Sequence, residues 1–279
     1  MKWLFAFLLA LIIFGGAAWF GYNFFVKEEI AVKKEQRGEV AVAPTPDISL
    51  PELQAAAKLR QDGKLTEARD ALIAFIQKYP TGLHVEEAKD LLGEVNIDIY
   101  LSRYPSPEKT EYVVQSGDVL AKIGRKLKTT PELIMRMNNL SGTMLHIGEH
   151  LLVSHPDFSV FIQRKAKLVV LLNHGAFFKQ YHILEEKLSP KQPSKITTKV
   201  SEIMAWKDGK RVGFGSKDYM SSTRWIRLGS AAYTLYSTAD SAHPNLTQPP
   251  PPVGLGLAAS DVEELSSLVN SHTPVSITD

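Results

Sequence analysis

Cysteine is absent from this chain of 279 residues. The absence excludes disulfide bonds, thiolate metal sites and catalysis by a thiol nucleophile. It does not fix the cellular compartment, because many exported proteins also lack cysteine. The chain also lacks a glycine-rich phosphate-binding loop and a Gly-x-Ser-x-Gly turn, so the sequence offers no motif for nucleotide chemistry or for that type of serine hydrolysis.

The chain also has no large excess of positive or negative charge. The chain has 32 Lys and Arg against 30 Asp and Glu, which gives a net charge of +2. This balance gives no reason to expect a nucleic-acid partner. Hydrophobic residues make up 44% and charged residues 22%, a composition typical of folded domains. The length allows two or three small domains.

Histidines that could bind a metal occur close together at His146, His150 and His155. Gly148 lies between the first two, which argues against a shared helical face, and no zinc-protease motif is present. We therefore expect neither a metal nor another cofactor.

An uncharged run over residues 3–26 is the strongest signal near the start of the sequence. Its length matches a bilayer core of about 30 Å, which predicts a transmembrane helix. A cleaved signal peptide is the alternative, although its apolar region would be shorter. We expect the C-terminal part in the periplasm or otherwise outside the cytoplasmic membrane, although more basic residues follow the run than precede it.

A helical segment is predicted over 50–103, after a linker over 27–49. Apolar residues recur at helical spacing, with a break at Asp62-Gly63 and a stop at Tyr79-Pro80. The pattern resembles a tetratricopeptide repeat, which implies a protein partner for this segment. A three-helix packing spacer is the equally weighted alternative.

The stretch 111–155 predicts a strand, two helices and a second strand. Alternation over 112–115 leads to a turn at Ser116-Gly117, and Asp118 is expected to cap the first helix. Thr130 and Pro131 start the second helix as capping residue and first helical residue.

These residues closely resemble the LysM domain. The matching motifs are Tyr-x-Val-x-x-Gly-Asp-x-Leu at 112–120, Asn-x-Leu at 138–140 and Ile-Gly-x-x-Leu at 147–151. The resemblance implies a shallow groove that binds N-acetylglucosamine-containing glycans, chiefly peptidoglycan. The family usually has threonine at the position of Val119, so one hydroxyl is missing here. The implied lining residues are Gly117, Asp118, Val119, Leu120, Leu145, His146 and Ile147; the alternative is that Gly117 and Asp118 only build the turn.

Strands are predicted from residue 158 onward. Hairpins reverse at Asn173-His174-Gly175 and at Asp208-Gly209. A helix over 261–269 follows, with Ser260 as its expected cap and Glu263 at the capping-box position. A closing strand lies at 273–277.

This order, with the Asp-Val-Glu-Glu-Leu of 261–265, resembles the catalytic domain of the L,D-transpeptidases over 158–279. That family carries a histidine-glycine pair and later a Ser-His-Gly-Cys-Ile-Arg-Leu motif. Aligned on Leu257, the catalytic positions are occupied by Tyr236, Ser237, Pro252, Gly254 and Gly256. Gly254 has no side chain to act as nucleophile, Pro252 cannot act as a base and Gly256 has no guanidinium, so the resemblance implies a degenerate domain.

Together these features predict a multidomain α+β chain with an anchor, a helical spacer, a βααβ module and a mainly-β domain. We expect a membrane-anchored, non-catalytic protein that binds peptidoglycan. Two alternatives stand beside it. One is a transpeptidase-type enzyme with relocated residues, for which Ser241 and His243 are the candidates, and the other is an adaptor that uses the helical repeat.

Overall fold

The structure is a computed structural model that describes residues 47–188, 195–229, 233–246, 248–249 and 253–279. Residues from Ser49 to Asp279 form one compact unit. The expected anchor at 3–26, nearly all of the linker and Pro252 lie outside the described residues. Within the described ranges, no helix is long and apolar enough to span a membrane.

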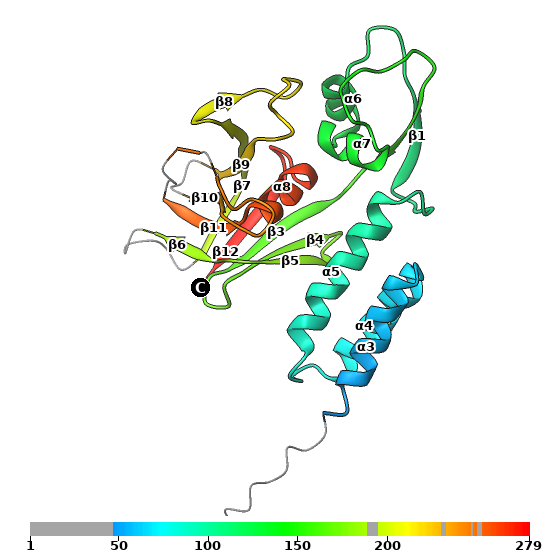
Figure 1. Cartoon of the computed structure of the whole chain (residues 1–279), viewed down its shortest axis with the longest axis vertical. Helices are drawn as coiled ribbons and strands as arrows, with labels where there is room; N and C mark the ends of the chain where they lie inside the picture. The colour runs from blue at the N-terminus through cyan, green and yellow to red at the C-terminus, as the bar shows by residue number, and fades with distance from the viewer. Residues whose placement is uncertain (1–46, 189–194, 230–232, 247, 250–252) are drawn as a thin grey trace, which may run out of the picture. The chain divides into compact units, whose positions relative to one another are not determined.

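Three helices open the described chain, as the spacing of apolar residues predicts (Figure 1). They are α3 (Leu50–Gln61), α4 (Leu65–Lys78) and α5 (Val85–Leu101). Gly63 adopts a positive φ of 75° at the predicted break, a conformation that suits glycine. Their shared apolar faces meet around Leu53, Ala68, Leu72, Phe75 and Leu92.

The βααβ module follows with β1 (Lys109–Val113), α6 (Leu120–Leu127), α7 (Pro131–Met137) and β2 (His150–Ser154). β1 and β2 pair antiparallel. The predicted cap of α7 is confirmed, because the Thr130 hydroxyl accepts the N–H of Leu133 at 2.9 Å. The predicted cap of α6 is wrong. Val119 occupies the cap position without a side-chain bond, and Asp118 bonds backward to the preceding turn.

A curled ten-stranded sheet forms the C-terminal part, in the order β5-β4-β3-β12-β7-β9-β10-β11-β6 with β8 paired to β7. Neighbours are antiparallel except β12 with β3 and β10 with β11, which are parallel. Both predicted hairpin turns are confirmed, at 173–175 and 208–209, and a further reversal at 164–167 separates β3 from β4. The strands are β3 (Phe158–Gln163), β4 (Leu168–Asn173), β5 (Ala176–His182), β6 (Glu185–Lys187), β7 (Lys195–Lys207), β8 (Lys210–Val212), β9 (Thr223–Leu228), β10 (Tyr233–Thr238), β11 (Gly254–Ala258) and β12 (Pro274–Thr278).

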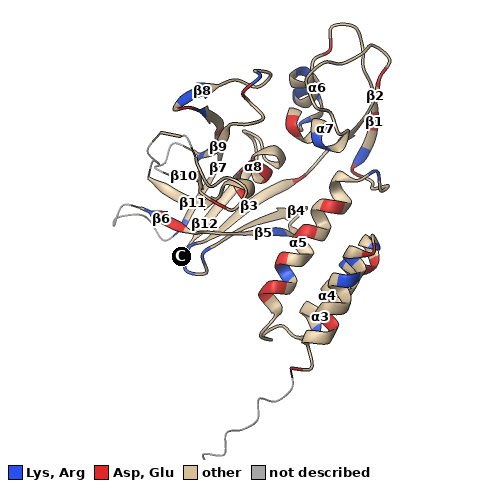
Figure 2. Cartoon of the chain, viewed as in Figure 1, with Lys and Arg blue, Asp and Glu red and all other residues tan. Residues whose placement is uncertain are grey.

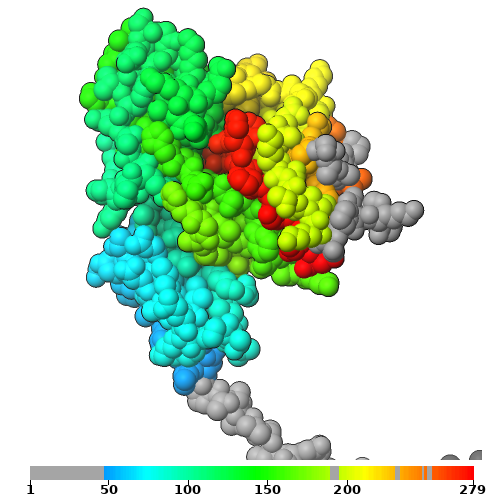
Figure 3. Space-filling view, turned by 180° about the vertical axis from the view of Figure 1, so that it is seen from behind, coloured from blue at the N-terminus to red at the C-terminus, as the bar shows by residue number. Residues whose placement is uncertain are grey.

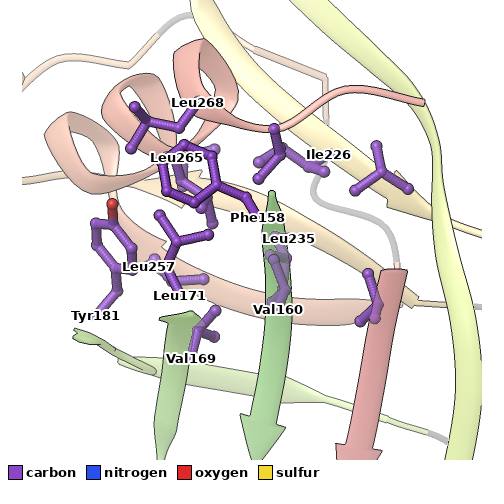
Figure 4. Close-up of a cluster of buried hydrophobic side chains, with 14 of the residues drawn as sticks. Phe158, Val160, Val169, Leu171, Tyr181, Ile226, Leu235, Leu257, Leu265 and Leu268 are labelled. Atoms are coloured by element: carbon purple, nitrogen blue, oxygen red, sulfur yellow. The ribbon is translucent and has the colours of Figure 1, made fainter. Parts of the chain in front are cut away.

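The main core lies between this sheet and helix α8 (Ala259–Leu268). Leu265 and Leu268 of the helix point toward Leu171 and Leu257 of the sheet (Figure 4). Burial of such side chains contributes about 1.5–3 kcal/mol each.

The start of α8 differs from the prediction. The helix begins at Ala259, its cap position is Ala258, and Ser260 is inside the first turn with no capping side-chain bond. Asp240, from the loop after β10, supplies the acceptor instead, and its Oδ2 receives the N–H of Ser260 at 2.7 Å. The exposed helix N–H group is thus satisfied by a residue twenty positions upstream.

Helix α5 ties the helical segment to the rest of the unit. Ile97 and Tyr100 belong to the same core as the sheet, and the Tyr100 hydroxyl lies 2.5 Å from the Ser154 Oγ at the end of β2. At the C-terminal end of α5, Lys109 Nζ donates to the carbonyl oxygens of Ile99, Ser102 and Tyr104. On the face shown in Figure 3, the C-terminal residues in red lie against the green βααβ segment, consistent with the bond from Arg136 to the Ser267 Oγ.

Candidate glycan-binding site

Two loops of the βααβ module lie side by side because the backbone joins them. The N–H of Gly148 donates to the carbonyl oxygen of Val114, and the N–H of Val114 donates to Glu149, both at 2.9 Å. These bonds extend the pairing of β1 and β2 beyond the strands. Loop 115–119 and loop 144–148 therefore meet at one end of the module.

The first loop is held by Asp118. Its Oδ2 accepts the N–H of Gln115 at 2.9 Å and the hydroxyl of Tyr112 at 2.7 Å. The bond from the Gln115 N–H, followed by that from Tyr112, lowers the pKa of Asp118 below its usual value. The carboxylate is therefore charged at neutral pH and fixes the turn.

The second loop is closed in a similar way. The backbone N–H of His146 donates to Glu149 Oε2 at 2.9 Å, and the N–H of Glu149 donates back to the His146 carbonyl oxygen. Gly117 in the first loop and Gly148 in the second have φ of 80° and 84°, and no atom lies within 4 Å of a side chain built at either. Both glycines therefore leave open space above the loop backbone.

Exposed apolar side chains flank this space. Val119 is 52% exposed, Ile147 is 74% exposed and Met144 is 78% exposed. Among the described residues, the N–H groups of Gly117, Val119 and Ile147 donate to no protein acceptor. An apolar surface beside unused backbone donors suits the apolar faces and hydroxyl or acetamido groups of a sugar.

The seven residues predicted from the sequence do not share one environment. Gly117, Val119, His146 and Ile147 are exposed on the two loops, and Asp118 is half-buried. Leu120 is buried and Leu145 packs partly against the same small core, so these two support the loops from below. Met144 and Tyr112 were not predicted. Tyr112 could have been found as the first residue of the motif, because its hydroxyl bonds Asp118.

Four of the positions aligned with the transpeptidase motifs, Tyr236, Ser237, Gly254 and Gly256, lie on two neighbouring strands, β10 and β11. In the parallel pairing of β10 with β11, Tyr236 is opposite Gly256, and Ser237 is opposite Leu257. Pro252 lies outside the described residues.

Neither glycine of β11 has room for a side chain. A Cβ at Gly254 would meet the carbonyl oxygen of Thr234 and would come within 2.7 Å of its nitrogen. A Cβ at Gly256 would lie 2.8 Å from the ring of Tyr236 and 2.6 Å from Thr238 Cγ2. The close approach of β10 explains why glycine occupies both positions.

Tyr236 is fully buried, and its hydroxyl donates to Glu185 at 3.2 Å. Burial, reinforced by the negative charge of Glu185, raises the pKa of Tyr236 to about 12. Gln248 covers the neighbouring position, since its amide donates to the Ser237 carbonyl oxygen at 2.7 Å and accepts from Trp225 at 2.8 Å. Glu185, Tyr236, Ser237 and Gln248 line a pocket of about 490 Å³, and the Lys187 ammonium lies 5.5 Å from the ring centroid of Tyr236.

The candidates for relocated chemistry do not come together as a nucleophile and base. His243 Nδ1 lies 3.0 Å from Asp240, and its Nε2 lies 3.8 Å from Glu263. No hydrogen bond joins His243 to Ser241 in the described part of the chain. Within that part, no three acidic or histidine side chains gather as a metal site.

Comparison with known families gives one match by sequence. Residues 112–154 match the model of the LysM domain, so this segment is a LysM domain, as the motifs indicated. A search of curated proteins gave no match.

Solved structures that the chain resembles include L,D-transpeptidases. One is from Mycobacterium smegmatis (8% identity, TM-score 0.31, covering 48% of this chain and 65% of that one). A second is from Stackebrandtia nassauensis (10% identity, TM-score 0.31, covering 53% of this chain and 65% of that one). A third is from Mycobacterium tuberculosis (14% identity, TM-score 0.30, covering 48% of this chain and 63% of that one). Each match covers less than two thirds of the transpeptidase chain.

Proposed function

We propose that this protein binds N-acetylglucosamine-containing glycan, chiefly peptidoglycan, through its LysM domain, and that its C-terminal sheet is not catalytic. The observation that carries the glycan proposal is the meeting of loops 115–119 and 144–148. They present exposed Val119, Met144 and Ile147 beside backbone N–H groups that donate to no acceptor in the described part of the protein. The lining comprises Gly117, Asp118, Val119, His146 and Ile147, with Leu120 and Leu145 as its support.

The non-catalytic proposal rests on the space around β11. Acyl transfer of the transpeptidase type needs a nucleophile beside a base, and the nucleophile position is Gly254. A side chain there would collide with the backbone of Thr234. The histidine position holds Tyr236, whose neutral hydroxyl has a pKa of about 12 and is bonded to Glu185.

The remaining parts of the proposal concern the membrane anchor and the cellular location of the protein. The uncharged run at 3–26 would anchor the chain in the membrane, and the glycan-binding part would lie in the periplasm or outside the cytoplasmic membrane. Alkaline carbonate extraction tests the anchor. Release of the full-length protein into the soluble fraction contradicts it.

Co-sedimentation of the full-length protein with purified sacculi tests the binding. The wild-type chain is expected in the pellet, and Gly117→Val is expected to weaken binding, because a β-branched residue at φ 80° distorts the turn. Gly213→Val is the control, since Gly213 is a loop glycine with open space and no positive φ.

Absence of the wild-type protein from the pellet contradicts the glycan proposal and favours an adaptor that acts through α3–α5. Release of terminal D-alanine from a tetrapeptide stem would contradict the non-catalytic proposal and direct attention to His243.

A further inference from the structure

Two lysines of α6 lie beside the first loop of the glycan groove. Lys122 Nζ donates to the carbonyl oxygen of Gly117 at 2.9 Å. Lys126 Nζ lies 5.1 Å from the ring centroid of Tyr112, the residue whose hydroxyl bonds Asp118. Both lysines are exposed, and the basic residues of α6 are drawn in blue in Figure 2. The two ammonium groups therefore stand at the rim of the site.

Acidic residues leave this positive charge only partly compensated. In the described part of the chain, neither lysine forms an ion pair, although the charges of both act on the Asp118 carboxylate. Asp118 Oδ2 is already bonded to Gln115 and Tyr112. On the opposite loop, Glu149 accepts the N–H of His146. The two ammonium groups of α6 thus lie beside a loop that carries one carboxylate, that of Asp118.

The third basic residue of this stretch points elsewhere. Arg125 lines a cavity of about 460 Å³ together with Arg211 and Asn270, away from the groove. The charge of Lys122 and Lys126 is therefore a feature of the groove side of the helix, and Arg125 provides an internal comparison.

We propose that Lys122 and Lys126 make the groove prefer N-acetylglucosamine glycans that carry carboxylates over neutral ones. This inference rests on the proposed function. A glycan strand of peptidoglycan bears carboxylates on its peptide stems, whereas a chitin oligomer bears none. Lys122 keeps two further N–H donors after bonding Gly117, and an ammonium can donate to a carboxylate in many orientations. The preferred ligand is thus a strand with its acidic stems in place.

The experiment compares native sacculi with sacculi whose carboxylates have been converted to amides by carbodiimide and ammonia. The full-length protein is titrated against both, and the ratio of the two dissociation constants measures the preference. We expect the wild-type protein to bind native sacculi about threefold or more tightly, an effect of the size of one or two exposed ion pairs. The preference is expected to shrink in about 1 M salt, where the screening length is about 3 Å.

Lys122→Gln and Lys126→Gln are each expected to lower this ratio toward 1, by about 1.5-fold or more. Arg125→Gln removes the same charge from the same helix and is expected to leave the ratio unchanged. Equal binding of the wild-type protein to native and amidated sacculi overturns the inference while the proposed function stands. An equal fall of the ratio in Arg125→Gln also overturns it, because only net charge would then matter. Failure of the wild-type protein to bind either preparation overturns the proposed function and the inference together.

Discussion

Tyr236 lies directly opposite Gly256 on the parallel strands β10 and β11, and the tyrosine ring occupies the space that a side chain at Gly256 would need. In the transpeptidase resemblance these positions hold a histidine and an arginine. Here a buried ring and a glycine fit each other. Tyr236 and Gly256 therefore form one packing arrangement that joins β10 to β11.

Gly256→Ala is expected to destabilise the protein by about 1–3 kcal/mol, because its Cβ would press on Tyr236 and Thr238. Urea unfolding followed by tryptophan fluorescence measures the loss. Gly213→Ala, which meets no atom within 4 Å, is the control. Equal stability of the two variants would show that the strands adjust without cost.

Gly254→Cys is expected to remain unlabelled by a carbapenem. The new side chain collides with the Thr234 backbone. The position at which the resemblance would put a histidine is occupied by Tyr236, whose hydroxyl is bonded to Glu185 and offers no base. Intact-mass spectrometry after incubation with the drug provides the measurement. Ser241→Cys, a thiol on an exposed loop, controls for unspecific reaction of a thiol. Selective labelling of Gly254→Cys would show that more of the catalytic geometry survives.

Most features set by neighbouring residues were predictable from the sequence, although the Asp118 cap of α6 is a local prediction that is wrong, because Asp118 bonds the N–H of Gln115 instead. The turns at 173–175 and 208–209 and the Thr130 cap depend on local residues, and all three predictions are confirmed. The cap of α8 comes from Asp240, and no spacing rule indicates that a loop residue would displace Ser260. In the candidate site, the motif located both loops, but the burial of Leu120 and the exposure of Met144 depend on packing.

Asp240→Ala is expected to cost about 1 kcal/mol at pH 7 through loss of the helix cap. Burial alone would raise the pKa of Asp240, but the N–H groups of Ser260 and His243 outweigh it and lower the pKa to about 2. A lowered pKa stabilises the fold above the usual value near 4, and this contribution disappears as the pH falls toward 2. The stability difference between wild type and variant should therefore shrink between pH 4 and pH 2, as urea unfolding at several pH values can show. A constant difference would contradict the cap.

Asp261 is expected to have the opposite pH dependence. Burial raises its pKa to about 6; Lys179 opposes this, and Glu264 and Glu94 add to it. A raised carboxyl pKa means that the folded state resists ionisation, so stability falls as the pH rises from about 4 to about 6. Asp261→Asn should therefore stabilise the protein by about 1 kcal/mol at pH 7 and have no effect near pH 3.5. Thermal unfolding at both pH values measures this, and destabilisation at pH 7 would contradict it.

Ile147→Ser is expected to weaken sacculus binding, because it removes an apolar contact from the lip of the groove, with little loss of stability since Ile147 is 74% exposed. Met220→Ser, at an exposed apolar residue outside the LysM domain, is the control. Val119→Thr is expected to leave binding unchanged or to improve it by restoring a hydroxyl. Unaltered binding by Ile147→Ser would place the sugar elsewhere.

The ammonium of Lys109 bonds three carbonyl oxygens at the end of α5, and Lys109 is also the first residue of β1. These three hydrogen bonds therefore fix the start of β1 to the C-terminal end of α5. Tension on a glycan strand bound in the groove would pass from β1 into α5 through the Lys109 bonds and through the contact of Tyr100 with Ser154. The connecting segment 102–108 could extend only after these bonds break. Freeing the LysM domain under such a load would therefore require the Lys109 bonds to break together with the bonds that Thr130 and Arg136 make to Ser267 of α8.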